Sequence, residues 1–177
     1  MLKINPKKTE TKIVQEYLLS SVGPRPIALA STIDIKNIPN LSPFSFFNVF
    51  SGNPPILIFS PARRIRNNTE KDTLRNLKQV KEVVINIVSE DITKKMVKSS
   101  LDYDSDIDEF RESGLTHLQS DLIKPFRVKE SPVQMECKVN KIISLGNSGG
   151  SGNLIICEIL LIHICEKILD KKNRIDQ

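Results

Sequence analysis

The sequence predicts a mainly β fold, a small barrel of five or six strands with a few short peripheral helices. Its 177 residues are enough for one hydrophobic core and too few for two typical domains. Short apolar runs rich in β-branched residues recur along the chain and are bounded by glycine and proline. Most consecutive runs are joined by turns, which favours local antiparallel pairing over a parallel sheet with helical crossovers.

The first part of the chain contains three predicted strands. Residues 27–33 (IALASTI) begin directly after Gly-Pro-Arg-Pro and end at a polar turn. Residues 41–50 alternate polar and aromatic side chains, which predicts a single strand with small hydroxyl groups on one side. The sequence Ser-Gly-Asn-Pro-Pro at residues 51–55 forces a turn, and residues 56–60 form the third apolar run.

Apolar side chains are spaced as in short helices at residues 72–78 and 91–100. Asp72 or Thr73 can cap the first of these helices. The second helix is expected to turn three side chains inward, namely Ile92, Met96 and Val97. Between the two helices, residues 83–88 (VVINIV) predict a buried strand.

The last part of the chain predicts a long hairpin. Residues 133–145 and 154–164 are two long strand-like runs, and the glycine-rich residues 146–152 between them predict a flexible hairpin connection. Residues 101–131 are acidic at first and then mixed in character. We expect this stretch to be a long excursion with at most one helical turn, around Phe110.

Composition indicates a folded protein of the cytoplasm. Hydrophobic residues make up 39% of the chain and charged residues 27%, as in globular proteins. The amino terminus lacks the apolar stretch of a signal peptide, and no apolar run is long enough to span a bilayer. Three cysteines without a CxxC pair favour reduced thiols. The net charge of +5 is compatible with nucleic acid, with an anionic cofactor or with neither.

Several common catalytic and metal-binding patterns are missing from the sequence. The glycine-rich residues 149–152 are not followed by the Gly-Lys-Ser/Thr of a phosphate loop, so a hairpin turn is the better interpretation. The alternating aspartates of residues 102–108 lack the glycine and glutamate of a calcium loop. His117 and His163 have no cysteine or carboxylate spacing typical of a metal site. No nucleophile motif for acyl transfer is found.

Two stretches remain as candidates for binding. Ser31 and Thr32 end the first strand, and residues 42–48 add hydroxyls, an amide and aromatic rings suited to a planar polar heterocycle. Core packing explains the same residues equally well. Residues 63–75 gather cations and a hydroxyl group near an expected helix amino terminus, which favours a phosphate dianion. A solvated basic loop is the alternative.

Four segments follow one another over residues 23–88, namely GPRPIALASTID, NLSPFSFFNVFSGNPPILIFSP, RRIRNNTEKDTLRN and VVINIV. In this order and spacing the chain resembles the flavin reductase-like FMN-binding split-barrel family, especially its flavoredoxin-like branch. The later segments DEFRESGLT, ESPVQMEC and SGNLIICEILLIHI are also similar to that branch. The resemblance implies an FMN-binding split β-barrel and a homodimer with FMN at or near its interface.

The resemblance also implies which residues hold the cofactor. The isoalloxazine ring and ribityl chain are expected to lie between residues of the first two strands, namely Ser31, Thr32, Ser45, Phe46, Phe47 and Asn48. The phosphate group is expected to contact Ser60, Arg64, Lys71 and Thr73. No catalytic acid or base and no metal ion is expected, because the flavin carries the chemistry.

The implied function is that of an NAD(P)H:FMN oxidoreductase, in which reduced nicotinamide gives hydride to flavin N5. An alternative is a flavoprotein that only relays electrons, with a redox protein or a monooxygenase as a candidate partner. A more remote alternative is a small basic β-barrel that binds single-stranded nucleic acid. The phenylalanines cluster in one strand rather than along a groove, which argues against it.

Residues 1–177 are expected to form one flavin reductase-like domain. Members of the family usually continue beyond the point at which this chain stops. The chain is therefore expected to be either a natural short form or a form truncated at its carboxyl end.

Overall fold

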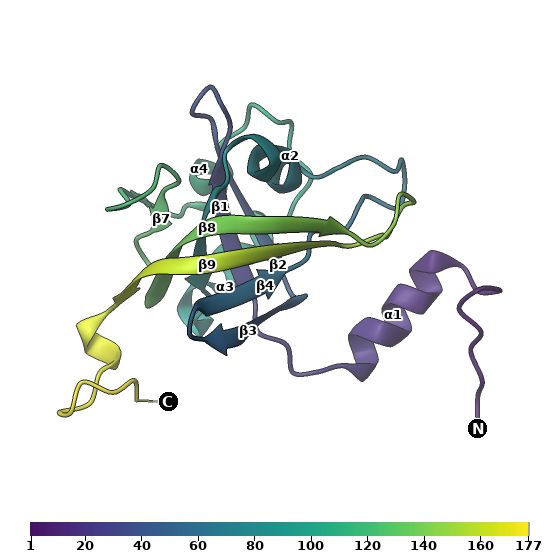
Figure 1. Cartoon of the computed structure of the whole chain (residues 1–177), viewed down its shortest axis with the longest axis horizontal. Helices are drawn as coiled ribbons and strands as arrows, with labels where there is room; N and C mark the ends of the chain where they lie inside the picture. The colour runs from purple at the N-terminus through teal and green to yellow at the C-terminus, as the bar shows by residue number, and fades with distance from the viewer. Residues whose placement is uncertain (177) are drawn as a thin grey trace.

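The computed structural model describes residues 1–176 and has a mainly β architecture (Figure 1). An antiparallel sheet has the strand order β2-β1-β5-β8-β9-β4-β3. Its strands are β1 (Ala28–Ile33), β2 (Pro39–Phe44), β3 (Phe47–Gly52), β4 (Pro55–Phe59), β5 (Glu82–Ile87), β8 (Val133–Ser144) and β9 (Asn153–Ile164). The predicted fold class is confirmed. The prediction that the chain is a short or truncated form concerns its carboxyl end, which lies outside the described residues.

The two edge strands of this sheet follow each other directly in the chain. β2 ends at Phe44 and β3 begins at Phe47, so the two edges come within about 11 Å of each other at this point. The Ser60 N–H donates to the Phe46 carbonyl at 2.9 Å across the same corner. The sheet therefore curls into a barrel, and β2 and β3 form no ladder with each other within residues 1–176.

The prediction of one strand over residues 41–50 is wrong. The structure divides this stretch into β2 and β3, and Ser45 and Phe46 lie between them outside both ladders. The alternation of polar and aromatic residues continues through the corner, so the pattern alone does not reveal the break. As a result, residues 39–44 and 47–52 lie on opposite edges of the sheet.

Apolar side chains form two clusters, one inside the barrel and one outside it. Ala28 and Ala30 point into the barrel, where the largest fully buried side chains are Leu57, Phe59, Leu74, Leu77, Ile85 and Ile155. Leu29 points the other way and packs with Leu41 and Phe110. Because it is covered on both faces, β1 has six consecutive buried residues. This explains why its sequence lacks the alternation of a half-exposed strand.

The helices are short and peripheral, and none of them in the described part of the chain is long and apolar enough to cross a membrane. They are α1 (Thr11–Ser21), α2 (Asp72–Gln79), α3 (Thr93–Lys98) and α4 (Glu109–Ser113), with 3-10 turns at Glu90–Ile92 and Glu166–Ile168. The predicted helix at residues 72–78 is confirmed as α2, but its N-cap is Lys71 and no side chain caps it. Val97 is 54% exposed, so the expectation that it faces inward is wrong.

Two elements differ from what the sequence predicted. Residues 101–131 contain the expected helical turn, α4, and also a small hairpin of β6 (His117–Leu118) and β7 (Arg127–Val128) that was not predicted. Helix α1 was not predicted either. It projects from one end of the barrel (Figure 1) and has no buried residue.

Candidate functional site

Two adjoining cavities open near the corner where β2 passes into β3. The larger has a volume of about 510 Å³ and the smaller about 40 Å³. Arg64, Lys71, Ser100 and Asp102 line both of them. The cavities therefore form one depression, whose larger part we call the wide end and whose smaller part we call the narrow end.

The wide end combines apolar surface with hydroxyl groups. The β2–β3 corner contributes Phe44, Ser45 and Phe46, and the segment after β4 contributes Ser60. Phe46 is 40% exposed, since it lies outside the ladders of both strands. Leu19 of α1 also lines this end. An apolar surface with a few hydroxyls suits a flat ring that has polar edges.

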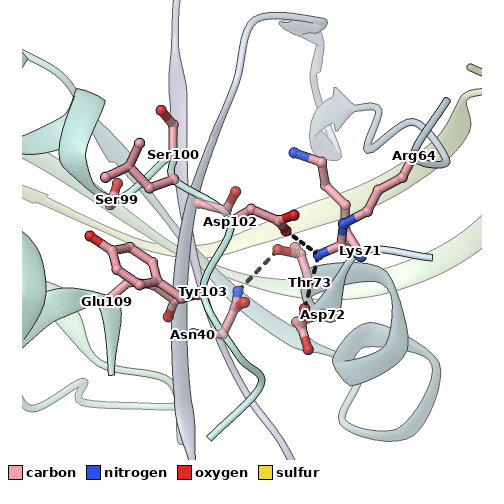
Figure 2. Close-up of a pocket in the computed structure, with 12 residues that line it drawn as sticks. Asn40, Arg64, Lys71, Asp72, Thr73, Ser99, Ser100, Asp102, Tyr103 and Glu109 are labelled. Carbon is pink, nitrogen blue, oxygen red and sulfur yellow. Dashed lines mark hydrogen bonds and ion pairs between the residues drawn. The ribbon is translucent and has the colours of Figure 1, made fainter. Parts of the chain in front are cut away.

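The narrow end lies at the amino terminus of α2 (Figure 2). No side chain caps this helix. The Leu74 N–H donates to the Lys71 carbonyl at 3.0 Å, whereas the N–H groups of Asp72 and Thr73, in the same first turn, precede the first hydrogen bonds of the helix. Thr73 belongs to that turn, and Asn40 and Ser42 line the same cavity from β2. The helix dipole adds positive potential at this end. The narrow end therefore has the features of an anion site.

Lys71 is a half-buried cation at the junction of the two ends. Its Nζ forms no hydrogen bond or ion pair with any residue from 1 to 176, and it lies 5.4 Å from the centroid of the Phe44 ring. Burial lowers the pKa of this ammonium, Arg64 lowers it further, and Asp102 opposes both effects. An anion bound in the depression would stabilise the charged form and raise this pKa again.

Arg64 is held in place by its own loop and by two carboxylates. Its Nη1 donates to the Glu70 carbonyl at 2.7 Å, and its Nη2 lies 3.5 Å from Asp72 Oδ2 and 3.2 Å from Asp102 Oδ1. Arg66 contacts Asp102 as well. Asp102 would therefore compete with a bound anion for the guanidinium groups of Arg64 and Arg66.

The glycine-rich tip of the β8–β9 hairpin supports the loop that carries these arginines. The Gly150 N–H donates to the Arg63 carbonyl at 3.0 Å, and the Arg63 N–H donates to the Ser151 carbonyl at 2.9 Å. A Cβ at Gly149 would lie only 2.9 Å from the Ile65 backbone. The glycines are thus needed for close approach of the two backbones as well as for the turn.

Most arginines of the basic loop are already paired. Arg63 Nη1 lies 3.0 Å from Glu70 Oε1, and Lys78 Nζ lies 2.7 Å from the same oxygen. Arg75 contacts Asp72. These pairs neutralise much of the positive charge on which the nucleic-acid alternative depended.

A buried network of amides and hydroxyls supports the narrow end from below. Asn40 Nδ2 donates to Thr73 Oγ1 at 3.0 Å and to Thr32 Oγ1 at 3.1 Å. Asn76 Nδ2 donates to the same Thr32 oxygen at 3.2 Å. Thr32 and Thr73 are fully buried as residues. The network links β1, β2 and α2, and so fixes the position of the Thr73 hydroxyl.

Six of the ten predicted site residues line the depression. They are Ser45, Phe46 and Ser60 at the wide end, Thr73 at the narrow end, and Arg64 and Lys71 at both. These residues come from four separate segments of the chain, and the barrel corner brings them together.

The other four predicted residues line neither part of the depression. Ser31 is fully buried in β1, and its Oγ has no hydrogen-bond partner in the described structure. Thr32 lies in the buried network below the narrow end, where its Oγ1 accepts a hydrogen bond from Asn40 Nδ2. Phe47 packs against the barrel core, while Asn48 is exposed on β3 and accepts a hydrogen bond from the Val49 N–H at 2.8 Å. The break at the corner explains why Phe47 and Asn48 lie apart from Ser45.

Sequence reasoning missed three kinds of lining residue. Asn40 lies two positions before Ser42 on β2, and Ser42 already belonged to the candidate stretch of residues 42–48, so this alternate spacing was the available signal for Asn40. Leu19 belongs to a helix that was not predicted. Glu109 lies 68 positions from Leu41, whose N–H donates to Glu109 Oε2 at 3.0 Å. No local pattern indicates that contact.

Three potential metal ligands approach one another elsewhere in the barrel, namely Asp121, Glu136 and His163. The Glu136 carboxylate already accepts hydrogen bonds from the backbone N–H groups of Asp121 and Leu122 at 2.8 and 2.7 Å. It also lies 2.7 Å from His163 Nε2. Because these contacts occupy the carboxylate, the group has the features of a structural hydrogen-bonded cluster.

A family model described as the flavin reductase like domain matches residues 20–174. Among curated proteins, an uncharacterized protein of Aquifex aeolicus is 38% identical over 165 residues, which are 93% of this chain and 82% of that protein.

The chain is also similar to several solved structures. Nitrilotriacetate monooxygenase component B from Bacillus cereus is 29% identical, with 99% of this chain and 87% of that chain covered and a TM-score of 0.91. A Shewanella frigidimarina protein described with a split barrel domain is 26% identical, with 96% and 82% covered and a TM-score of 0.80. Flavoredoxin of Desulfovibrio vulgaris shares the fold at 20% identity, with 88% and 78% covered and a TM-score of 0.74.

Proposed function

Because this chain belongs to the flavin reductase-like family, we propose that it is an FMN-binding oxidoreductase that takes electrons from NADH or NADPH. Residues 1–177 would form one such domain, located in the cytoplasm. The three unpaired cysteines are consistent with that location. Residues 20–174, which match the family model, include all ten predicted cofactor contacts.

The observation that carries this proposal is the unpaired Lys71 ammonium between the two ends of the depression. A half-buried cation with no carboxylate partner favours an anionic ligand. The Thr73 hydroxyl and the first-turn N–H groups of α2 add hydrogen-bond donors beside it. On the other side, the wide end offers Phe46 and hydroxyl groups. Together these residues fit a ligand with a ring at one end and a phosphate at the other.

When bound, FMN supplies a ring that accepts hydride and passes electrons on singly or in pairs. The protein residues would orient it. Ser45 and Ser60 would donate or accept hydrogen bonds at the ring edge and the ribityl chain, and Phe46 would cover part of the ring. Lys71 and Thr73 would hold the phosphate, with Arg64 adding positive potential. Ser31, Thr32, Phe47 and Asn48 would support these groups from adjacent strands.

We also propose that the protein is a homodimer. The outer face of β9 exposes Leu160, Ile162 and Ile164, which are 42%, 49% and 40% exposed. On the neighbouring edge, β3 exposes Val49 and Phe50, at 52% and 65%. We call these five residues the β3/β9 patch. β4 pairs with β3 and with residues 155–158 of β9, so the two exposed groups lie at the same side of the sheet, where a second copy of the chain would cover them.

An electron carrier without reductase activity is the alternative within the same family. The likeness to a structure described as a flavin reductase favours reductase activity, and the likeness to a monooxygenase component B favours a monooxygenase as partner. Both functions require bound flavin, and they differ in whether NAD(P)H reduces it at the protein.

The decisive experiment has two steps. First, FMN is added to purified protein, and we expect flavin absorption bands to remain after gel filtration. Second, NADH or NADPH oxidation is followed with excess free FMN, and we expect catalytic turnover. Turnover no faster than the protein-free reaction would support the carrier instead. A colourless protein that binds no flavin but shifts oligonucleotides would overturn both readings.

A further inference from the structure

The narrow end also contains the carboxyl group of Glu109, to which the proposed function assigns no role. It lies in the first turn of α4, where Asp108 caps the helix by accepting the Phe110 N–H at 3.0 Å. Phe110 is fully buried and anchors the helix against Leu29 and Leu41. This anchoring places Glu109 in the same cavity as Lys71 and Thr73 (Figure 2).

The Glu109 carboxyl has little to stabilise a negative charge. It accepts one hydrogen bond from another element, from the Leu41 N–H at 3.0 Å, and it forms no ion pair with any described cation. Burial raises its pKa to about 7. The N–H groups of Leu41 and of Glu109 itself oppose this rise in pKa, while the carboxylates of Asp72 and Asp108 add to it. Near neutral pH the group is therefore a mixture of carboxylic acid and carboxylate.

Charged and titratable groups face Glu109 from each element around the narrow end. They are Lys71 and Asp72 at the start of α2, Arg64 in the basic loop, Asp102 and Tyr103 in the acidic segment, and Asp108 at the N-cap of α4. The carboxylates of Asp72 and Asp102 interact with Arg64. Glu109 is the carboxyl group of the narrow end that lacks a cationic partner within residues 1–176.

We propose that Glu109 holds the phosphate of FMN in its protonated form, by donating a hydrogen bond from the carboxylic acid. A volume of about 40 Å³ leaves room for few waters between Glu109 and a bound phosphate. At that separation an ionised carboxylate would repel the dianion, whereas a carboxylic acid can donate to it. This inference rests on the proposed function, because it concerns the phosphate of the same ligand.

The proposal requires that FMN binding consume a proton above neutral pH. The carboxylate form of Glu109 takes one proton from solvent when the ligand binds, and no other bond changes. For a pKa of about 7, the ionisation of Glu109 by itself lowers the affinity for FMN about tenfold from pH 6 to pH 8. The phosphate has its own second pKa near 6, so its dianion fraction rises about twofold over the same range, and the net fall in affinity is about fivefold.

The test measures the dissociation constants of FMN and riboflavin at pH 6, 7 and 8 for the wild type, Glu109→Gln and Glu112→Gln. Glutamine at position 109 can still accept the Leu41 N–H, but it does not titrate. Glu112 is exposed on the same helix and serves as the matched control. We expect FMN affinity to fall about fivefold from pH 6 to pH 8 in the wild type and in Glu112→Gln, and to rise about twofold in Glu109→Gln, where only the phosphate titrates.

Riboflavin separates a contact with the phosphate from an effect on the fold. It lacks the phosphate, so its affinity should not change with the state of Glu109. Equal pH dependence for FMN and riboflavin, or equal dependence in the wild type and Glu109→Gln, would overturn the proposal. Failure of all three proteins to bind FMN at any pH would instead overturn the proposed function.

Calorimetry on the wild type alone gives an independent result that does not depend on a variant folding. FMN is titrated at pH 7.5 in two buffers with different ionisation enthalpies. We expect uptake of about 0.8 proton per FMN bound, because most of Glu109 is ionised at this pH. Binding without proton uptake would contradict the proposal.

Discussion

Asn40 donates a hydrogen bond from Nδ2 to Thr73 Oγ1 at 3.0 Å, and so joins β2 to the first turn of α2. Since the Thr73 oxygen accepts this bond, the hydroxyl proton is not used by it. The residue is fully buried, which holds the hydroxyl in one place at the narrow end. Asn40 is therefore a positioning residue for the proposed phosphate site.

Replacing Lys71 with alanine should weaken FMN binding about ten- to a hundredfold. The substitution removes a charge-assisted contact of roughly 1.5–3 kcal/mol. Riboflavin, which has the same ring and no phosphate, should bind both proteins alike. Fluorescence titration of the two ligands measures the difference. Lys124→Ala, at an exposed position outside the depression, is the control, and equal losses for both ligands would show that Lys71 supports the fold.

Replacing Thr73 with valine should weaken FMN binding about fivefold, because it deletes a neutral hydrogen bond of about 1 kcal/mol. It also leaves one Asn40 donor bond unmade, so the free energy of unfolding should fall by about 1 kcal/mol. Thr73→Ser keeps the hydroxyl and should bind FMN nearly as the wild type does. Titration and urea unfolding test both effects. Normal FMN affinity in Thr73→Val would place the phosphate elsewhere.

Replacing Asp102 with asparagine should strengthen FMN binding about two- to fivefold. Asp102 pairs with Arg64 at 3.2 Å and also contacts Arg66, so its removal frees positive charge at the narrow end. The pair is partly exposed, and such pairs contribute less than about 1 kcal/mol. Titration at two salt concentrations should show a gain that shrinks at high salt. A loss of affinity would mean that Asp102 orders Arg64 for the ligand instead of competing with it.

Replacing Glu109 with glutamine should stabilise the ligand-free protein at alkaline pH. The folded state raises the pKa of Glu109 from 4.5 to about 7, so the folded state binds more protons than the unfolded state between these values. The wild type therefore loses stability as pH rises through this window, and Glu109→Gln should not. Thermal melting at pH 5 and pH 8 should show a larger advantage for the variant at pH 8. An equal difference at both values would show that Glu109 does not titrate as described.

Introducing negative charge into the β3/β9 patch should dissociate the proposed dimer into monomers. Phe50→Glu combined with Ile162→Glu places carboxylates on a surface that a second copy would cover. Light scattering should then report a monomer, while circular dichroism remains unchanged. Val97→Glu is the matched control, since Val97 is 54% exposed on α3 outside the patch. A wild-type protein that is already monomeric with FMN bound would contradict the proposal of a dimer.

Local patterns predicted the elements of the barrel well where neighbouring residues decide them. The run IALASTI became β1, the glycine-rich hairpin joins β8 and β9, and the spacing of Leu74 and Leu77 became α2. Helix α1 was missed, although Ile13, Tyr17 and Leu18 recur in it at helical spacing. None of its residues is buried in the structure, so no packing against the barrel accounts for this apolar side of the helix.

The sequence by itself determined the fold class and the family, and it indicated the segments that line the candidate site, because strand and turn signals and the family motifs are contiguous in the chain. Only the tertiary structure decided which of those residues meet. The barrel corner brings Ser45 and Phe46 beside Lys71 and sends Asn48 to the opposite edge. Likewise, the contact between Glu109 and Leu41 joins residues 68 positions apart. Such contacts depend on how the sheet closes, and a local pattern of side chains does not encode that closure.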